Sequence, residues 1–340
     1  MIVLTAPGLA GALSAEVSGL SGVRITDTGH DGRADLVLCE VDPGRERAIL
    51  RLRTAEDVLV EFGRTLRSEG DRAAWIAKRL WRPSRVGAAV ALWRAAGGGS
   101  GIPNYRVITR VLHEDSFRRT ELRRALGAVV SAGEPRWRPA DPARLELWAL
   151  EYTAGRFVAG IRLSTVAMRQ HGGRSRERAG ALRPAVAAAM VQLAGDRPGE
   201  LLDPCCGSGT ILTEAVAAGW EAIGTDLDSH AVEAARQNAR TVEIEVGDAR
   251  RIALPDDAVD AVVSNLPFGR QYTVDGDEQV WLRAVLTELA RVTRPGGRLV
   301  LLVPELPSAA LPAGVRLRER HPIRLLGART TIWSLGIIGS

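Results

Sequence analysis

The stretch Leu201–Leu212, LLDPCCGSGTIL, decides the fold of the second half of this 340-residue chain. It begins as a short apolar run that ends in an acid, turns through two glycines, and enters a sequence with apolar residues at helical spacing. Gly207 and Gly209 lack a Cβ atom, so the backbone can turn sharply there and approach a ligand closely. The stretch therefore predicts a strand, a tight glycine turn and a helix.

This glycine turn favours a single nucleoside over a dinucleotide. Dinucleotide-binding proteins carry G-x-G-x-x-G, but here Leu212 stands at the third glycine position. Asp203 also stands four residues before the first glycine, where its charge would repel a pyrophosphate. The pattern fits S-adenosylmethionine (SAM) better than NAD, although an ordinary turn between a core strand and a helix is the alternative for this loop alone. The loop residues expected to hold SAM are Asp203, Cys205, Gly207, Ser208, Gly209 and Thr210.

Two more predicted strands end beside acids. Glu221–Thr225 leads into Asp226, about 20 residues after the glycine turn, where an acid can hold ribose hydroxyls. Val242–Val246 leads into Asp248. A solvated sheet edge is the alternative, but the ends of parallel strands meet at one edge, where ligands bind. The further expected cofactor contacts are Asp226, Leu227, Asp248 and Ala249.

A second loop, Asn265-Leu266-Pro267-Phe268, follows the apolar run Ala258–Ser264, which is typical of a buried parallel strand. The amino group of a base is a poor nucleophile because its lone pair is delocalised into the ring. Groups that accept hydrogen bonds from both of its N–H bonds stabilise the positive charge that develops during transfer. Asn265 offers a side-chain carbonyl, and Pro267 restrains the backbone of Leu266 so that its carbonyl can be a second acceptor.

Phe268 offers a flat face on which a base can stack, worth roughly 1–3 kcal/mol. These four residues, Asn265, Leu266, Pro267 and Phe268, are the predicted catalytic group for methyl transfer to an amino nitrogen. An ordinary strand-to-loop turn is the alternative when the tetrapeptide is taken alone. No metal is required, because a sulfonium already makes its methyl group electrophilic.

The remaining pattern of the second half alternates strands and helices, which predicts a doubly wound, mostly parallel sheet. A helix is expected over Val186–Leu193 and another over Asp277–Val292, ended by Pro295-Gly296-Gly297. Arg298–Val303 reads as a fifth strand. The tail predicts a terminal hairpin from Val315–Leu326 and Thr330–Ile338.

Composition limits the class of protein. The length favours two domains, and the hydrophobic fraction of 46% suffices for proper cores. The amino terminus lacks the basic region of a signal peptide, and no apolar run approaches a membrane span. Three cysteines, Cys39, Cys205 and Cys206, give neither a disulfide framework nor a metal site, so a reducing cytoplasm is expected. Cys206 could be a nucleophile, but no histidine stands near it in sequence, which favours a place in the cofactor loop.

The net charge of +5 is compatible with a nucleic-acid partner, and its distribution is uneven. Arg169–Arg183 carries five arginines, with Arg162 just upstream. Glycines in this segment favour a domain linker, and its charge suits a phosphate backbone; a solvated linker is the alternative. The predicted basic linker covers residues 167–180.

The first half carries no catalytic motif. Helices are expected from Gly8–Glu16 and Ala73–Leu80, a strand over Asp35–Glu40, and an element of either kind over Thr54–Phe62, with Gly97–Gly101 as a loop. From Tyr105 the pattern predicts a strand, a helix capped by Thr120, and two strands over Arg144–Tyr152 and Arg156–Leu163.

The combination of Asp203–Thr210 with Asn265–Phe268 resembles the class I SAM-dependent methyltransferases that act on amino nitrogen, whose signature is N/D/S-P-P-Y/F. Leu266 replaces a proline of that signature, which is tolerable because the family uses this position through its carbonyl. N-L-P-F-G is similar to the variant in THUMP-containing RNA guanosine N2-methyltransferases. The order of elements in the first half resembles the THUMP module with its ferredoxin-like companion.

This resemblance implies an α/β, seven-stranded class I methyltransferase sheet over residues 181–340. It also implies a ferredoxin-like subdomain at 1–95 and a THUMP-type RNA-binding domain at 96–166. The implied activity is methyl transfer from SAM to the N2 amine of a guanosine in tRNA, with the target base flipped out of its stack. Ribosomal RNA, DNA adenine, a protein amide, or a non-catalytic RNA-binding role are the alternatives.

Overall fold

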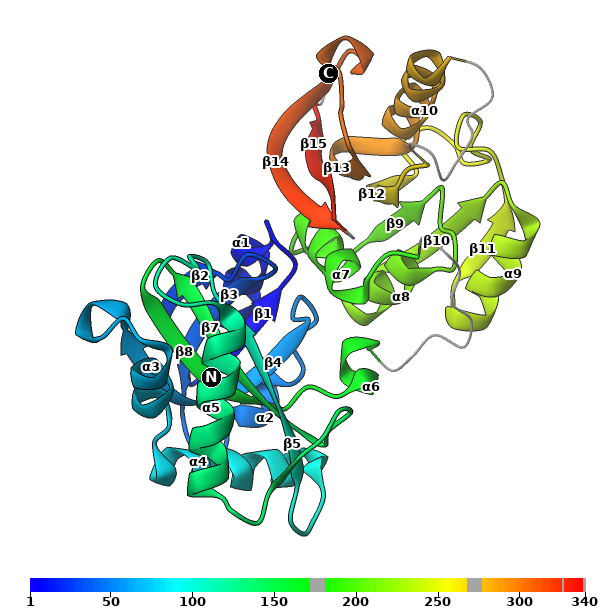
Figure 1. Cartoon of the computed structure of the whole chain (residues 1–340). Coiled ribbons are helices and arrows are strands. Elements are labelled where there is room, and N and C mark those ends of the chain that lie inside the picture. Colours follow the sequence, from blue (N-terminus) through cyan, green and yellow to red (C-terminus); the bar gives the residue numbers. More distant parts are fainter. Residues whose placement is uncertain (172–180, 268–276, 326, 339–340) are drawn as a thin grey trace. The chain divides into compact units, whose positions relative to one another are not determined.

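The computed structural model describes residues 1–171, 181–267, 277–325 and 327–338 (Figure 1). The chain forms two compact units, Met1–Arg169 and Gln170–Ser340. In the described parts, no helix is both long enough and apolar enough to cross a membrane.

The second unit is built on a seven-stranded sheet in the order β11-β10-β9-β12-β13-β15-β14. Adjacent pairs from β11 to β13 are parallel, and β15 lies antiparallel between β13 and β14. The predicted mostly parallel sheet and its terminal hairpin are therefore confirmed. The strands are β9 (Glu200–Asp203), β10 (Glu221–Asp226), β11 (Glu243–Val246), β12 (Val259–Asn265), β13 (Thr293–Val303), β14 (Val315–Leu325) and β15 (Ala328–Ile337).

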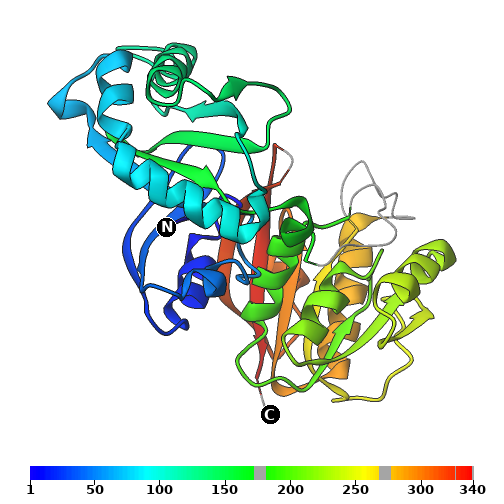
Figure 2. The ribbon, with the colours of Figure 1, turned by 90° about the horizontal axis from the view of Figure 1, so that it is seen from below.

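Helices cover both faces of this sheet (Figures 1 and 2). One face carries α7 (Pro184–Leu193), α8 (Thr210–Ala217) and α9 (Ser229–Asn238), and the other carries α10 (Glu278–Val292). The caps follow from the sequence, since the Asp228 carboxylate accepts the His230 N–H at the start of α9. The α10 stripe packs on the strands through Leu282, Val285, Leu286, Leu289 and Val292.

One boundary differs from the prediction. Pro295-Gly296-Gly297 does not end α10; the helix stops at Val292, and β13 begins at Thr293. The register of β12 against β13 shifts between Val259 and Ala261, so the proline and glycines form an irregular opening of the strand.

The first unit is an α+β structure on an eight-stranded sheet of mixed orientation, in the order β2-β3-β1-β4-β8-β7-β5-β6. Its strands are β1 (Ile2–Thr5), β2 (Val23–His30), β3 (Asp35–Val41), β4 (Asp57–Leu66), β5 (Asn104–Arg110), β6 (Arg138–Pro139), β7 (Leu145–Thr153) and β8 (Arg156–Arg162). Its helices are α1 (Ala10–Ser18), α2 (Glu46–Ile49), α3 (Ala73–Leu80), α4 (Pro83–Trp93), α5 (Arg119–Gly133) and α6 (Val166–Arg169). Short 3-10 turns lie at Arg67–Glu69 and, in the second unit, Ser308–Ala310, and a π-helical turn lies at Arg94–Gly98.

The sheet of the first unit joins both halves of its sequence, because β4 pairs with β8 along most of its length. The division into a subdomain at 1–95 and a THUMP-type domain at 96–166 stays a prediction, and the two ranges lie in one compact unit. The prediction that Thr120 caps a helix is wrong. Arg118 is the extended residue before α5, so Thr120 lies inside the first turn. β2 and α4 were not predicted.

Candidate active site

The carboxyl ends of β9, β10, β11 and β12 form one edge of the second sheet. Asp203 ends β9, Asp226 ends β10 and Asn265 ends β12. Because these strands are parallel and adjacent, the glycine loop after β9 and the loop after β12 lie side by side. The structure thus brings together the two segments on which the sequence interpretation depends.

The glycine loop is a tight turn that requires glycine. Gly207 and Gly209 have φ values of +54° and +79°, a region that disfavours residues with a Cβ. A Cβ on Gly209 would lie 3.2 Å from the Cβ of Ala235 on α9. A Cβ on Gly207 would meet no atom within 4 Å, so that side of the loop is open to a ligand.

Asp226 fixes the loop and offers acceptors at its open side. One carboxylate oxygen accepts the Gly207 N–H at 2.8 Å and the other accepts the Asp228 N–H at 3.0 Å. Each carboxylate oxygen has more than one acceptor site, so hydroxyl donors can still be accommodated. Leu227 is 70% exposed and Val246, paired with Asp226, is 58% exposed. This arrangement suits a nucleoside, because the carboxylate can accept the ribose hydroxyls while the two apolar side chains flank the base.

Asp203 lies beneath the loop and is only 1% exposed. One of its oxygens accepts the Ser264 hydroxyl at 2.7 Å and the Cys205 N–H at 3.2 Å. Burial raises the pKa of Asp203 to about 7, against the opposing effect of the Ser264 hydrogen bond. Ser264 immediately precedes Asn265, so this bond links the base of the cofactor loop to the second loop. Sequence reasoning missed Ser264, although a hydroxyl in an apolar strand was the available signal.

The other predicted loop residues are largely buried. Burial raises the pKa of the Cys205 and Cys206 thiols, so neither is a ready nucleophile. The Ser208 carbonyl accepts the side-chain amide of Asn238 at 2.9 Å, a contact that the sequence did not predict. Within the described residues the Ser208 hydroxyl has no hydrogen-bond partner, and Thr210, 6% exposed, opens α8.

Asp248 reaches the same edge, after β11, but its carboxylate is engaged. Both oxygens accept hydrogen bonds from the Arg250 guanidinium, at distances of 2.6 to 3.0 Å. These bonds lower the pKa of Asp248. Ala249 is 6% exposed, so only its backbone can serve a ligand.

The second loop leaves its polar groups available. Counting described residues only, the Asn265 side-chain amide has no hydrogen-bond partner. Leu266 is 3% exposed and packs in the core against α10, so its backbone is the part that a ligand can use. Pro267 is half-buried, and Phe268 lies outside the described residues.

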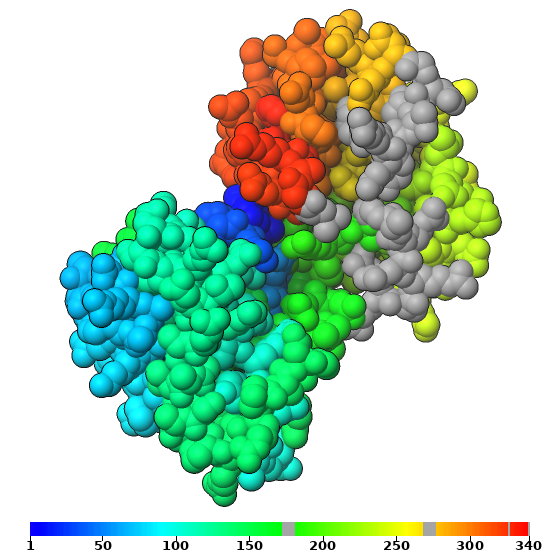
Figure 3. Space-filling view, viewed as in Figure 1, coloured from blue at the N-terminus to red at the C-terminus, as the bar shows by residue number. Residues whose placement is uncertain are grey.

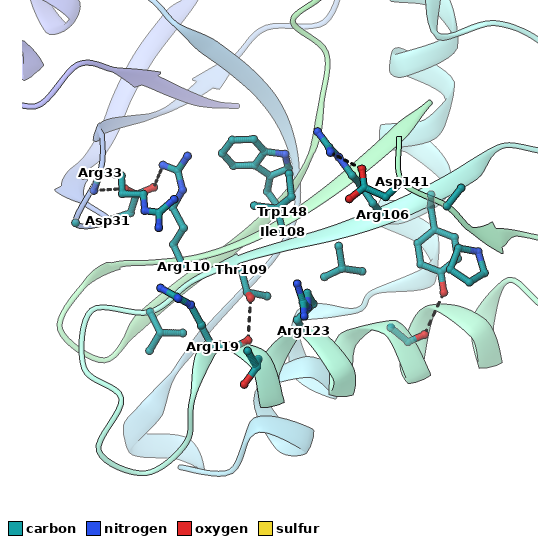
Figure 4. A pocket seen from close by; sticks show the side chains of 18 residues that line it. Asp31, Arg33, Arg106, Ile108, Thr109, Arg110, Arg119, Arg123, Asp141 and Trp148 are labelled. Carbon is teal, nitrogen blue, oxygen red and sulfur yellow. Dashed lines mark hydrogen bonds and ion pairs between the residues drawn. The ribbon is translucent and has the colours of Figure 1, made fainter. Parts of the chain in front are cut away.

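The first unit holds an open cavity of about 1010 Å³ between β5 and α5 (Figure 4). Five of its lining residues are arginines: Arg33, Arg106, Arg110, Arg119 and Arg123. The cavity is therefore strongly basic, and this clustering across distant segments was not predicted from the sequence.

Two of these arginines are held by acids and three are not. Arg106 pairs with Asp141, and Arg110 pairs with Asp31 and lies over the Trp148 ring, 4.8 Å from its centroid. The side chains of the other three arginines have no ion pair with any described residue. Those three are Arg33, Arg119 and Arg123. Guanidinium groups with no ion pair among the described residues suit the phosphates of a nucleic acid. Of the predicted basic linker, Gly172–Gly180 with Arg174, Arg176 and Arg178 lies outside the described residues.

The strand order of the second unit, its inserted antiparallel strand and the glycine loop at the carboxyl edge define a class I methyltransferase domain. Residues 171–318, a little under half of the chain, match the family described as UPF0020, RMKL-like, methyltransferase domain. The match lies within the second unit, and the first unit lies outside it.

Two of the curated relatives that match part of the chain are methyltransferases. The bovine (Bos taurus) U6 snRNA (guanine-N(2))-methyltransferase THUMPD2 is 35% identical over 134 residues, which cover 36% of this chain and 26% of that protein. The tRNA (guanine(10)-N2)-dimethyltransferase of Methanothermobacter thermautotrophicus is 31% identical over 162 residues, covering 45% and 48%. The chain thus spans at most about half the length of these relatives.

A solved structure resembles the whole chain. The crystal structure of TrmN from Thermus thermophilus has a TM-score of 0.76, with 24% identity, and 99% of each chain is covered. At this identity the likeness concerns the fold, and it includes both units.

Proposed function

We propose that this chain transfers a methyl group from SAM to the exocyclic N2 amine of a guanosine in tRNA. The observation that carries the proposal is the adjacency of two loops at one sheet edge. One is a glycine loop tied to Asp226, and the other begins with Asn265, whose side-chain amide has no hydrogen-bond partner among the described residues. Two relatives of this chain are named as guanine-N2 methyltransferases, of tRNA and of U6 snRNA, which supports the choice of the amine.

The residues at the edge fit SAM. The open side of Gly207 admits the amino-acid part, Asp226 can accept the ribose hydroxyls, and Leu227 with Val246 can flank the adenine. When bound, SAM supplies a methyl group that a sulfonium makes electrophilic. In this proposal Asp203 acts from beneath, through its hydrogen bonds to Cys205 and Ser264, rather than by touching the cofactor.

The second loop orients the acceptor. The Asn265 side-chain oxygen and the Leu266 carbonyl accept the two N–H bonds of the guanine amine, which stabilises the positive charge that forms on nitrogen. The buried Leu266 side chain and the following Pro267 hold that carbonyl in place. Phe268 is proposed to stack on the base. The proton leaves to solvent after transfer.

The first unit is proposed to bind the RNA through its basic cavity. The three guanidinium groups of that cavity that have no acidic partner in the described parts of the chain can bind phosphates, while Trp148 and the paired arginines shape its wall. A cytoplasmic location belongs to the proposal, in keeping with three cysteines that are all free thiols.

Transfer of labelled methyl groups from SAM to total tRNA and, in separate reactions, to ribosomal RNA, DNA and protein, followed by analysis of the products, tests the proposal. We expect label in N2-methylguanosine of tRNA with the native chain and transfer about 10²–10³-fold slower with Asn265→Ala. Label in N6-methyladenine of DNA, label only in ribosomal RNA, or label only in protein would instead support a DNA adenine, a ribosomal RNA or a protein amide methyltransferase, respectively. Absence of any transfer while SAM binds would leave a non-catalytic protein.

A further inference from the structure

The hairpin of β14 and β15 carries three exposed arginines, Arg320, Arg324 and Arg329. None of their side chains has an ion pair or hydrogen bond with the described part of the chain. β14 is the last strand of the sheet, so its outer edge is also unpaired. Figure 3 shows the orange and red surface of this hairpin on one side of the second unit.

The strand register places these arginines on one face. Arg324 lies directly opposite Arg329, and Arg320 lies opposite Trp333. Residues two or four apart on a strand share a face, so Arg320 and Arg324 point to the same side, as do Arg329 and Trp333. Trp333 is half-buried, and its indole N–H donates to the Val303 carbonyl at 3.2 Å. The face thus holds three cations beside an anchored aromatic ring.

Two like charges directly opposite each other in an antiparallel pair destabilise the sheet. Among the described residues, no acidic side chain pairs with Arg324 or Arg329 to relieve this repulsion. A bound anion would do so, and two adjacent guanidinium groups are well suited to a phosphate.

The register also relates this face to the candidate active site. Asn265 pairs with Leu302, Leu302 with Ile332, and Ile332 with His321, so these four residues form one row across the sheet. β14 runs in the same direction as β13, and Arg324 therefore lies three residues beyond the row, toward the edge where Asn265 ends its strand. Strand spacings and rises put Arg324 roughly 17 Å from Asn265.

We infer that the face formed by Arg320, Arg324, Arg329 and Trp333, the hairpin face, binds the phosphate backbone of the substrate RNA a few nucleotides from the methylated base. This inference rests on the proposed function for the identity of the RNA. The hairpin face would hold the strand close to the reacting base, independently of the cavity in the first unit.

Arginines on an edge strand can also serve only to prevent unwanted strand pairing. If that were their role, replacing any exposed arginine of β14 would have the same effect on RNA binding. Arg316 and Arg318 provide the matched control, because they lie at the opposite end of the same strand and carry the same charge. Arg316 pairs with Gly336, and the Arg318 side chain lies over that glycine.

The test compares the full-length double variants Arg324→Gln/Arg329→Gln and Arg316→Gln/Arg318→Gln. Total tRNA binding is measured from 50 to 250 mM salt, with SAM calorimetry and thermal melting to verify folding. Two lost phosphate contacts should reduce the slope of log affinity against log salt by roughly 1.4–1.8. We expect at least tenfold weaker tRNA binding for the hairpin-face variant and less than twofold for the control. Arg324→Lys/Arg329→Lys should recover most of the slope.

Equal affinities and slopes in all variants would overturn the inference, as would an equal loss in the control. Unchanged tRNA affinity in the hairpin-face variant, together with weaker binding of polyglutamate to that variant than to the wild type, would overturn the inference and assign the face to an acidic protein. If the wild type forms no N2-methylguanosine, the proposed function fails; a selective loss of tRNA binding in the hairpin-face variant would still support the inference.

Discussion

Replacing Asp203 with asparagine should change how the stability of the second unit depends on pH. The wild-type carboxyl has its pKa raised by burial from 3.8 to about 7, so the folded protein holds this proton when the unfolded chain has lost it. The contribution of the protonated carboxyl to the free energy of unfolding is therefore complete below about pH 4. It is lost as the pH rises from there through about 7. At 1.36 kcal/mol per pKa unit, the wild type loses roughly 4 kcal/mol in total, of which roughly 2.6 kcal/mol falls between pH 5 and 8.

Asparagine removes this titration and keeps the oxygen that accepts from Ser264 and Cys205. Its amide N–H groups need new acceptors, and an unsatisfied one costs about 1–3 kcal/mol at every pH. We therefore expect Asp203→Asn to match or fall below the wild type at pH 5 and to gain roughly 2–3 kcal/mol relative to it by pH 8.

Urea unfolding at pH 5, 6, 7 and 8 measures this difference, and hydrogen exchange of peptides covering β9 and β12 reports the second unit separately. Ser264→Ala is the matched variant, since it removes the bond that holds the pKa of Asp203 down and should steepen the loss with pH. A constant difference between Asp203→Asn and wild type from pH 5 to 8, or a relative loss of stability as pH rises, would refute the reasoning.

Three other outcomes follow from the geometry of the edge. Asn265→Ala should lower the rate of methyl transfer by about 10²–10³-fold, as removal of one transition-state hydrogen bond does. Calorimetry should give a SAM affinity within a few-fold of the wild-type value. A large loss of SAM affinity would place Asn265 in the cofactor site instead. Gly209→Ala should destabilise the second unit by about 1–3 kcal/mol in urea unfolding, because the new Cβ meets Ala235 and the backbone is strained as well. Gly207→Ala is the control, since a Cβ there meets no described atom within 4 Å. An equal effect of the two substitutions would show that the contact with Ala235 does not matter. Asp226→Asn should weaken SAM binding at least tenfold in calorimetry, and unchanged binding would remove Asp226 from the site.

Much of the second unit was predictable because local patterns agree with the fold. The apolar run before Asp203, the paired glycines and the β-branched run before Asn265 can each be recognised in a short stretch of sequence. The terminal hairpin was also predicted, since its two strands alternate around Gly327.

The first unit was less predictable for physical reasons. β2 is only half-buried, so its sequence Val23–His30 lacks a clear alternation of apolar residues. α4 contains Gly87, which weakens a helical pattern. The cap of α5 is an extended arginine, which carries no local capping signal.

The side-chain contacts of the site could not be predicted from short stretches of sequence. Ser264 and Asp203 are 61 residues apart in sequence and meet only because β9 and β12 are neighbours. Arg250 engages Asp248 through a turn that the strand pattern did not indicate. The basic cavity joins Arg33 to residues of β5 and α5, which again requires the assembled sheet.

A crystal structure of the full chain with S-adenosylhomocysteine would show whether the two loops hold the cofactor and the acceptor as proposed. We expect the ribose hydroxyls on the Asp226 carboxylate, the thioether beside the open face of Gly207, and the Asn265 side-chain oxygen facing the position of the transferred methyl group. A ligand bound elsewhere, or an Asn265 amide turned into the apolar core, would contradict this expectation.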